Sequence, residues 1–175
     1  MLSELWARYE HLFYLLFFFF IAATYMTIKK VKVQSIIRDE RFSNAKKFIF
    51  GVETSMAISE EGLIGMVNFK LETLTVYIKE IAEFEMLLNK YIITGAKGSK
   101  SDGILFSGVS SKIKPILADE KFKEINLIIR LKNDRIFGIR LFKATRQKRV
   151  IEVKQDNIIQ MLETLEAVER KCKGK

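Results

Sequence analysis

Basic side chains gather in two stretches of the sequence where they could bind anions. One set directly follows the longest apolar run, and the other precedes the final amphipathic segment. The two sets are Lys29, Lys30 and Lys32, and Lys143, Arg146, Lys148, Arg149 and Lys154. Ammonium and guanidinium groups bind phosphate and carboxylate through charge-assisted hydrogen bonds. We interpret both sets as a solvated surface that faces the anionic lipids of a membrane, a role that requires no specific ligand.

Several kinds of catalytic and metal chemistry lack their residues in this sequence. His11 is the only histidine and Cys172 the only cysteine, so the chain has no Ser-His or Cys-His pair in its body, no disulfide framework and no thiolate zinc site. The carboxylates of Glu80, Glu83 and Glu85 alternate with apolar residues, as they do on a half-exposed strand. Nothing indicates two environments that would separate their pKa values for acid and base roles. We therefore expect no enzyme activity, no cofactor and no metal.

A glycine- and serine-rich stretch covers residues 94–111. Its segment 95–100 has the composition of a phosphate-binding loop but not the spacing of four residues before Gly-Lys-Ser/Thr. We interpret the stretch as a long exposed loop and, together with the exposed sheet edges, as a contact surface for a partner.

One uncharged run, residues 12–28, is long enough to anchor the chain in a membrane. As a helix it would rise about 26 Å, a little less than the hydrocarbon core of about 30 Å. No side of the run is polar, as the surface helix of a soluble protein would require. The alternative, a buried core helix, would need more surrounding chain than 175 residues supply. We predict a transmembrane anchor over residues 1–28.

Aromatic residues recur along one face of this anchor. Phe13, Phe17, Phe20 and Thr24 lie at three- and four-residue spacing. Stacked rings on that face could pack across a dimer or a larger ring, at about 0.5–1.5 kcal/mol for a good pair. Alternatively, the rings face lipid. Both interpretations stay open, and a homo-oligomer is one expected assembly.

The charges on either side of the run predict its orientation. Arg8 is balanced by Glu4 and Glu10, whereas residues 29–47 contain seven basic side chains. By the positive-inside rule, the body stays in the cytoplasm and the N-terminus lies outside the cell inner membrane. A cleavable signal carries its positive charge before the apolar run, so we expect an uncleaved, single-pass anchor. Residues 29–47 are either a basic juxtamembrane linker or a continuation of the anchor helix.

The remaining residues, 48–175, predict one cytosolic domain that is mainly β. Short apolar runs of alternating pattern, separated by turn residues, indicate strands, and apolar residues at helical spacing indicate one C-terminal helix. The expected strands are 48–59, 63–69, 73–79, 80–88, 124–131 and 136–143, and the expected helix is 156–171. Beyond residue 28 the chain has 29 basic and 19 acidic residues. This excess of basic residues is expected if the partner is an anionic lipid bilayer. Because the anchor already places the domain beside a membrane, we do not expect nucleic acid as a partner.

Three segments carry a recognisable pattern: Met56-Ala57-Ile58-Ser59-Glu60, Ile78-Lys79-Glu80-Ile81-Ala82-Glu83-Phe84-Glu85 and Leu127-Ile128-Ile129-Arg130-Leu131-Lys132-Asn133-Asp134. They resemble a bacterial pleckstrin-homology-like family, of a kind found beside short C-terminal oligomerisation modules. The resemblance covers roughly residues 48–171. It implies an α+β fold in which a bent antiparallel sheet, or partial barrel, is capped by a C-terminal amphipathic helix. Phosphoinositide-binding relatives carry basic residues in the first hairpin loop, whereas this loop begins with Glu60 and Glu61, which repel phosphate.

These features together predict a single-pass membrane protein whose cytosolic domain is a non-enzymatic docking or sensor module for a protein partner. The alternative is a ligand-gated membrane effector, for example in antiviral defence. In that case a small anionic or cyclic-nucleotide signal would bind the cytosolic domain and rearrange the anchors.

Overall fold

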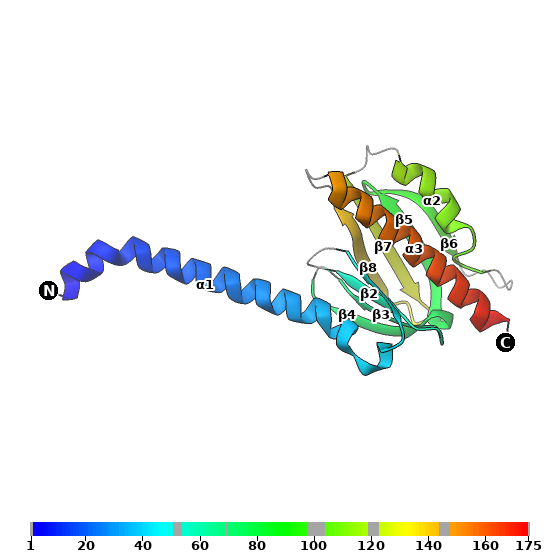
Figure 1. Cartoon of the computed structure of the whole chain (residues 1–175), viewed down its shortest axis with the longest axis horizontal. Helices are drawn as coiled ribbons and strands as arrows, with labels where there is room; N and C mark the ends of the chain where they lie inside the picture. The colour runs from blue at the N-terminus through cyan, green and yellow to red at the C-terminus, as the bar shows by residue number, and fades with distance from the viewer. Residues whose placement is uncertain are drawn as a thin grey trace.

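The computed structural model describes residues 2–50, 54–68, 70–97, 104–118, 123–143 and 148–174, without the side chains of residues 2–8, 94–97 and 148–154. One long helix extends from a body of strands and shorter helices (Figure 1). The elements are α1 (Leu2–Arg38), η1 (Glu40–Phe42), β1 (Lys46–Ile49), β2 (Ser55–Ile58), β3 (Leu63–Val67), β4 (Thr73–Tyr77), η2 (Ile78–Glu80), β5 (Ile81–Leu88), β6 (Tyr91–Lys97), α2 (Val109–Ala118), β7 (Glu124–Leu131), β8 (Ile136–Lys143) and α3 (Lys148–Lys173).

Helix α1 is the single candidate membrane span among the described residues. It contains an 18-residue window with a mean hydropathy of 1.8, and none of that window is buried. The side chains of its apolar run are turned outward, with Phe18 70% and Phe20 71% exposed. A core helix would be covered by the rest of the chain, so the exposure excludes that alternative for α1.

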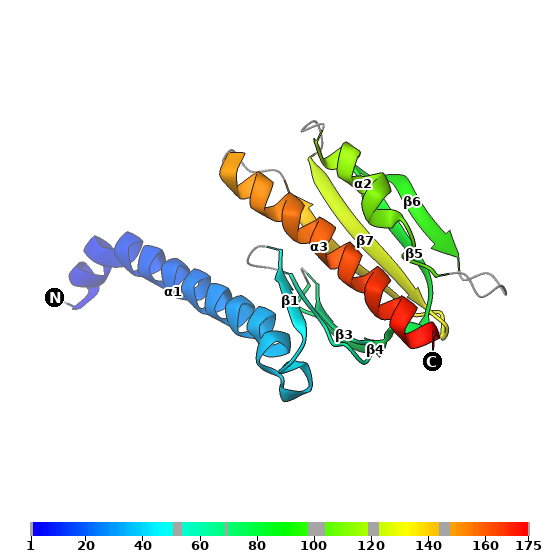
Figure 2. The same cartoon turned by 45° about the vertical axis from the view of Figure 1, so that its right-hand side comes forward.

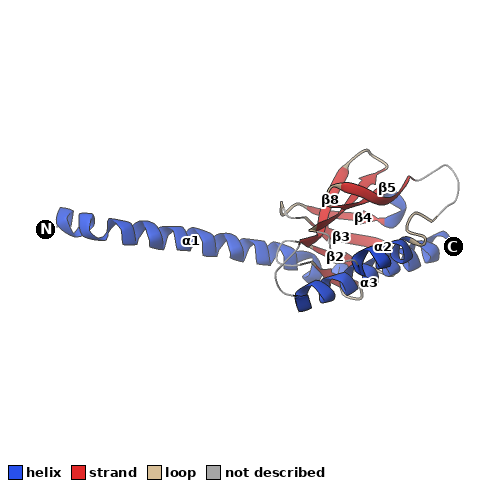
Figure 3. Cartoon of the chain, turned by 90° about the horizontal axis from the view of Figure 1, so that it is seen from above, coloured by secondary structure: helices blue, strands red, loops and turns tan. Residues whose placement is uncertain are grey.

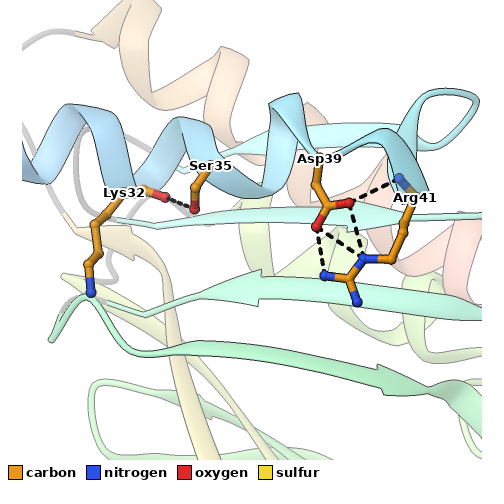
Figure 4. Close-up of polar contacts among 4 residues, drawn as sticks. All are labelled: Lys32, Ser35, Asp39 and Arg41. Carbon is orange, nitrogen blue, oxygen red and sulfur yellow. Dashed lines mark hydrogen bonds and ion pairs between the residues drawn. The ribbon is translucent and has the colours of Figure 1, made fainter.

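Residues 29–38 continue the helix that contains the candidate span, and only the residues after them turn back toward the sheet. Asp39 ends α1 with an extended backbone, and its carboxylate accepts the N–H of Arg41 at 2.9 Å. The Arg41 guanidinium donates to the same carboxylate at 2.7 Å from Nη2, as Figure 4 shows. These bonds hold the pKa of Asp39 below its usual value of 3.8 and raise that of Arg41. The predicted linker is therefore helical in its first half.

The strands form two four-stranded antiparallel sheets (Figure 3). The first has the order β1-β2-β3-β4, and the second has the order β6-β5-β7-β8. The hairpin β7–β8 occupies the two ranges expected from the sequence, with Asp134 in its turn at a φ of 62°. The chain is thus α+β, with an apolar N-terminal helix, two sheets and a C-terminal helix.

Two sequence predictions about the strands and loops are wrong. Residues 48–59 are not one strand, because β1 and β2 pair as an antiparallel hairpin. Residues 94–111 are not one long loop, because β6 continues to Lys97 beside β5 and α2 begins at Val109. Residues 98–103, in the middle of that stretch, lie outside the described part of the chain.

The main core lies between the two sheets and α3. The apolar stripe of α3 is buried as predicted, at Ile158, Met161, Leu162, Leu165 and Val168. Helix α2 lies beside α3 over the second sheet (Figure 2) and buries Val109, Ile113 and Leu117. Phe84 and Phe106 stack with ring centroids 4.6 Å apart, which joins β5 to the turn before α2.

A second, smaller core attaches α1 to the outer face of the first sheet. Val33, Ile36 and Phe42 pack against Ala57 and Val67. The Ser55 hydroxyl donates to the Val33 carbonyl at 2.8 Å, in a buried position. Helix α1 is continuous from the candidate span to this core, so the body packs directly on the same helix that contains the span.

Candidate docking groove

A groove of about 680 Å³ lies between β1 and α3. Its floor and walls combine apolar side chains with charged groups at the rim. The lining residues are Asn44, Lys46, Lys47, Phe48, Ile58 and Glu60 from the first sheet and its flanking turns, and Gln160, Glu163, Thr164, Ala167, Val168 and Lys171 from α3. This volume is within the range of about 300–1,000 Å³ that is common for ligand sites.

One wall of the groove is an edge strand. In the described part of the chain, β1 pairs with β2 and with no other strand. Phe50 donates its N–H to the Thr54 carbonyl at 2.9 Å, so Phe50 and Thr54 form a hydrogen-bonded pair. Hydrogen-bonded pairs alternate along an antiparallel ladder, and the Phe48–Met56 pair is therefore of the same type. It follows that the N–H and C=O of Lys47 point away from β2.

The other wall is fixed by contacts between the end of α3 and the β2–β3 turn. Lys171 Nζ lies 2.8 Å from Glu60 Oε2. The hydrogen bond and charge of Lys171, with a smaller contribution from Lys46, hold the pKa of Glu60 below its usual value, and the pKa of Lys171 is raised by Glu60. Gly62, at a φ of +86°, leaves room for Cys172, whose sulfur would lie 2.9 Å from an added Cβ.

The predicted basic residues do not form one cluster with the groove. Lys30 and Lys32 are exposed on α1, but Lys29 is only 9% exposed, with its ammonium 4.7 Å above the Tyr25 ring, so it is buried rather than solvated. Lys143 is exposed at the end of β8. Arg146 lies outside the described residues, as do the side chains of Lys148, Arg149 and Lys154 in the first turns of α3.

For Lys148 and Arg149 the structure describes the backbone alone, at the beginning of α3. The beginning of α3 is on the side of the body from which α1 extends, and its end is on the far side (Figures 1 and 2). The backbone of these two residues therefore lies on the side of the body nearer to α1.

The aromatic face predicted on the anchor is exposed along its whole length. Phe13 is 54%, Phe17 64% and Phe20 71% exposed. The hydroxyl of Thr24 donates to the Phe20 carbonyl at 2.8 Å within the same helix. Its hydrogen is thus already used within the helix, whereas the rings of Phe17 and Phe20 are mostly exposed.

Sequence reasoning missed a buried carboxylate that connects α3 with α2. Glu169 is 2% exposed, and its two oxygens accept the N–H groups of Leu105 at 2.8 Å and Phe106 at 2.9 Å. Lys173 lies 3.0 Å from the same carboxylate. All of these groups are satisfied within the chain, so the site organises the turn before α2. Its only sequence signal was an acidic residue at the edge of the apolar stripe of α3.

Among the described residues, no group of three or more His, Cys, Asp or Glu side chains is placed to hold a metal ion. No family model, curated protein or solved structure matches this chain.

Proposed function

We propose that this protein is a membrane-tethered docking module that holds an extended segment of a partner protein in the groove between β1 and α3. The observation that carries the proposal is the outward-facing backbone of Lys47 on the wall of that groove. A peptide can add to such an edge as a further strand, with main-chain hydrogen bonds providing affinity. Strand β1 has four residues, so the bound segment would extend about 13 Å.

The groove also suggests the chemistry of the segment. Apolar side chains, among them Phe48 and Val168, would contact one apolar residue of the partner. Lys46 at the rim favours an acidic residue beside it, because Glu60 is already paired with Lys171. Pleckstrin-homology-like domains, which the sequence resembles, serve as such docking platforms, and two antiparallel sheets with a C-terminal helix are compatible with that fold.

Proline substitution at Lys47 tests the groove. Because the N–H of Lys47 does not bond to β2, Lys47→Pro removes an edge donor while leaving the ladder intact, and proline is tolerated on edge strands. Lys47→Ala removes the same side chain but keeps the donor. A photo-crosslinker at Gln160 in the groove should capture a partner in wild type and in Lys47→Ala, and capture should be lost in Lys47→Pro. Capture that survives the proline, or that occurs equally from Lys114 on α2, would place docking elsewhere.

The anchor supports a cytoplasmic location for this module. The proposed topology has the N-terminus outside and the body inside the cell inner membrane, on account of the basic excess in residues 29–47. Protease added to intact spheroplasts should leave the body undigested, and should digest it after lysis. Digestion in intact spheroplasts would mean that the body lies outside and that the topology is the reverse of the one proposed.

The rigid junction favours a second candidate function, a ligand-gated membrane effector. Since Val33 and Ile36 of α1 belong to the domain's own packing, movement of the body would tilt the span. A small anionic or cyclic-nucleotide signal would be the trigger. Growth arrest on expression that requires the phenylalanines of residues 17–20 would favour this function, and expression without growth arrest would favour docking alone.

A further inference from the structure

We propose that the junction of α1 and β1 is a binding site for one anionic phospholipid. A groove of about 440 Å³ at this junction is lined by six residues of α1, between Met26 and Gln34, and by Ile49 of β1. The proposal rests on the membrane anchor put forward above, but it is independent of peptide docking between β1 and α3.

The position of this groove along α1 matches the depth of the headgroups. The uncharged run ends at Ile28, and the groove extends from Met26 to Gln34, about 12 Å along the helix. With the run in hydrocarbon, Met26 lies at the boundary of the acyl chains, and Lys30 and Gln34 lie in the polar interfacial layer. The groove therefore crosses the region where a phospholipid changes from apolar to charged.

The lining changes character in the same direction. At the bilayer end, Met26 is 54% exposed, and β1 contributes a second apolar side chain to the lining, Ile49, which is 49% exposed. At the other end, Lys30 is exposed and Gln34 is half-buried. Ammonium and amide groups bind a phosphodiester, while Met26 and Ile49 cover the first methylenes of an acyl chain. A free phosphate ion would leave the apolar half unused, so the groove fits a phospholipid better than a soluble anion.

Lys29 adds a fixed positive charge to the site. Its ammonium lies 4.7 Å above the Tyr25 ring, and the residue is only 9% exposed. Lys29 is thus engaged within the chain, and it contributes positive potential to the groove rather than a hydrogen bond to a headgroup. Lys30 then supplies the mobile cation that closes on the headgroup.

The helix offers a matched control for this site. Lys30 lines the groove and Lys32 does not, although both are exposed lysines two positions apart on α1. Two positions correspond to about 200° around a helix, so the two side chains point in nearly opposite directions. In Figure 4 the Lys32 side chain extends from α1, clear of the Asp39–Arg41 contacts. Lys30→Glu and Lys32→Glu therefore make the same change of charge at the same depth.

The test uses the full chain in nanodiscs of phosphatidylcholine with a minor fraction of phosphatidylglycerol. Native mass spectrometry would count the phosphatidylglycerol molecules that stay on the protein after its release. Wild type and Lys32→Glu should each retain one phosphatidylglycerol molecule. In Lys30→Glu the fraction of protein that retains this lipid should be about tenfold lower. Ile49→Trp fills the apolar part of the groove without changing the charge, so this variant should also lose the phosphatidylglycerol molecule. Inorganic phosphate should not displace that lipid from wild type.

Four results would overturn the proposal. Equal loss in both glutamate variants would mean general attraction to the anionic surface. Retention in Ile49→Trp, or displacement by inorganic phosphate, would mean that no lipid occupies the groove. A chain that does not co-elute with the nanodiscs would show that neither the proposed anchor nor the lipid site exists. Failure of the Lys47→Pro test alone would refute peptide docking and leave the lipid site unaffected.

Discussion

Phe42 lies against Gly65 so closely that a Cβ added to the glycine would be 2.6 Å from the ring's Cζ. Phe42 follows the anchor helix, and Gly65 is in the centre of β3, opposite Ala57 of β2. The small residues of the sheet thus provide the depression into which the end of the anchor packs. This contact, together with the bond from Ser55 to the Val33 carbonyl, holds the first sheet on the end of α1.

Gly65→Ala should weaken this junction. The new methyl group would also meet Ile36 Cγ2 at 2.8 Å, and Phe42 is fully buried, so neither side chain can move away without further shifts. Overpacking of this kind lowers the free energy of unfolding by about 1–3 kcal/mol. Urea denaturation in mild detergent, followed by circular dichroism, measures the change. Gly138→Ala is the control, because nothing lies within 4 Å of its added Cβ, and its effect should stay within about 0.5 kcal/mol. Equal losses of stability in Gly65→Ala and Gly138→Ala would contradict the close contact between Phe42 and Gly65.

Glu169→Gln should loosen the turn before α2. The carboxylate accepts two backbone N–H groups, at Leu105 and Phe106, and an amide can accept only on its single oxygen. One buried donor is then left unsatisfied, at a cost of about 1–3 kcal/mol. Hydrogen exchange should be faster at these two amides while the β7–β8 hairpin keeps its protection. Asp156→Asn, on an exposed position of the same helix, is the control. Unchanged exchange in Glu169→Gln would mean that the turn is held by apolar packing alone.

The Glu60–Lys171 pair should make stability depend on pH at both extremes. Because the pKa of Glu60 is lower in the folded chain, its contribution is present above the unfolded pKa, near 4.5, and is lost as pH falls through the folded value. Because the pKa of Lys171 is raised, its contribution is present below about 10.5 and is lost as pH rises through the folded value. The pair is exposed, so both effects should be small.

Thermal unfolding across pH measures this dependence. Relative to wild type, Glu60→Gln should lower the melting temperature at neutral pH and should make the acid limb of the profile shallower. The neighbouring exposed carboxylate, in Glu61→Gln, serves as the control. If the melting temperature falls equally at low pH in wild type and in Glu60→Gln, the loss of stability in acid is caused by other carboxylates.

Elements with strong local patterns were predictable from the sequence. The β7–β8 hairpin combines strict alternation with an Asn133-Asp134 turn, and α3 combines an apolar stripe with basic residues in its last turn. In both, local propensity and burial favour the same structure, so each residue range carries its own signal.

Elements that depend on distant contacts were not predictable. Helix α2 has only three buried apolar residues, contains Pro115, and is preceded by a turn bound to Glu169 more than sixty residues later. The second half of β6, residues 94–97, was assigned to a loop because Gly95, Ala96 and Lys97 have low strand propensity, and the pairing with β5 compensates for this. The groove lies between β1 and α3, whose lining residues are more than a hundred positions apart in the sequence. The pattern of either element alone therefore does not predict that the two lie side by side.

The last prediction concerns association of the anchors in the membrane. The span of 17 uncharged residues is slightly short for a bilayer, and packing of helices relieves mismatch of that sign at a fraction of a kcal/mol per ångström. Phe13, Phe17 and Phe20 present their rings outward on one face of α1, while the Thr24 hydroxyl is already bonded to the Phe20 carbonyl. We therefore expect ring packing, rather than interhelical hydrogen bonds, to hold two anchors together.

Cysteine crosslinking along residues 13–24, in a Cys172→Ser background, measures this association. Cys172 is the only native cysteine, so each variant carries one reactive thiol. Crosslinking yield should rise and fall with helical period and peak at positions 13, 17, 20 and 24. Thr24→Val, which removes the hydroxyl and keeps the shape, should leave the yield unchanged, whereas Phe17→Ala should reduce it. Uniform or absent crosslinking would mean that the rings face lipid and that the anchor is monomeric.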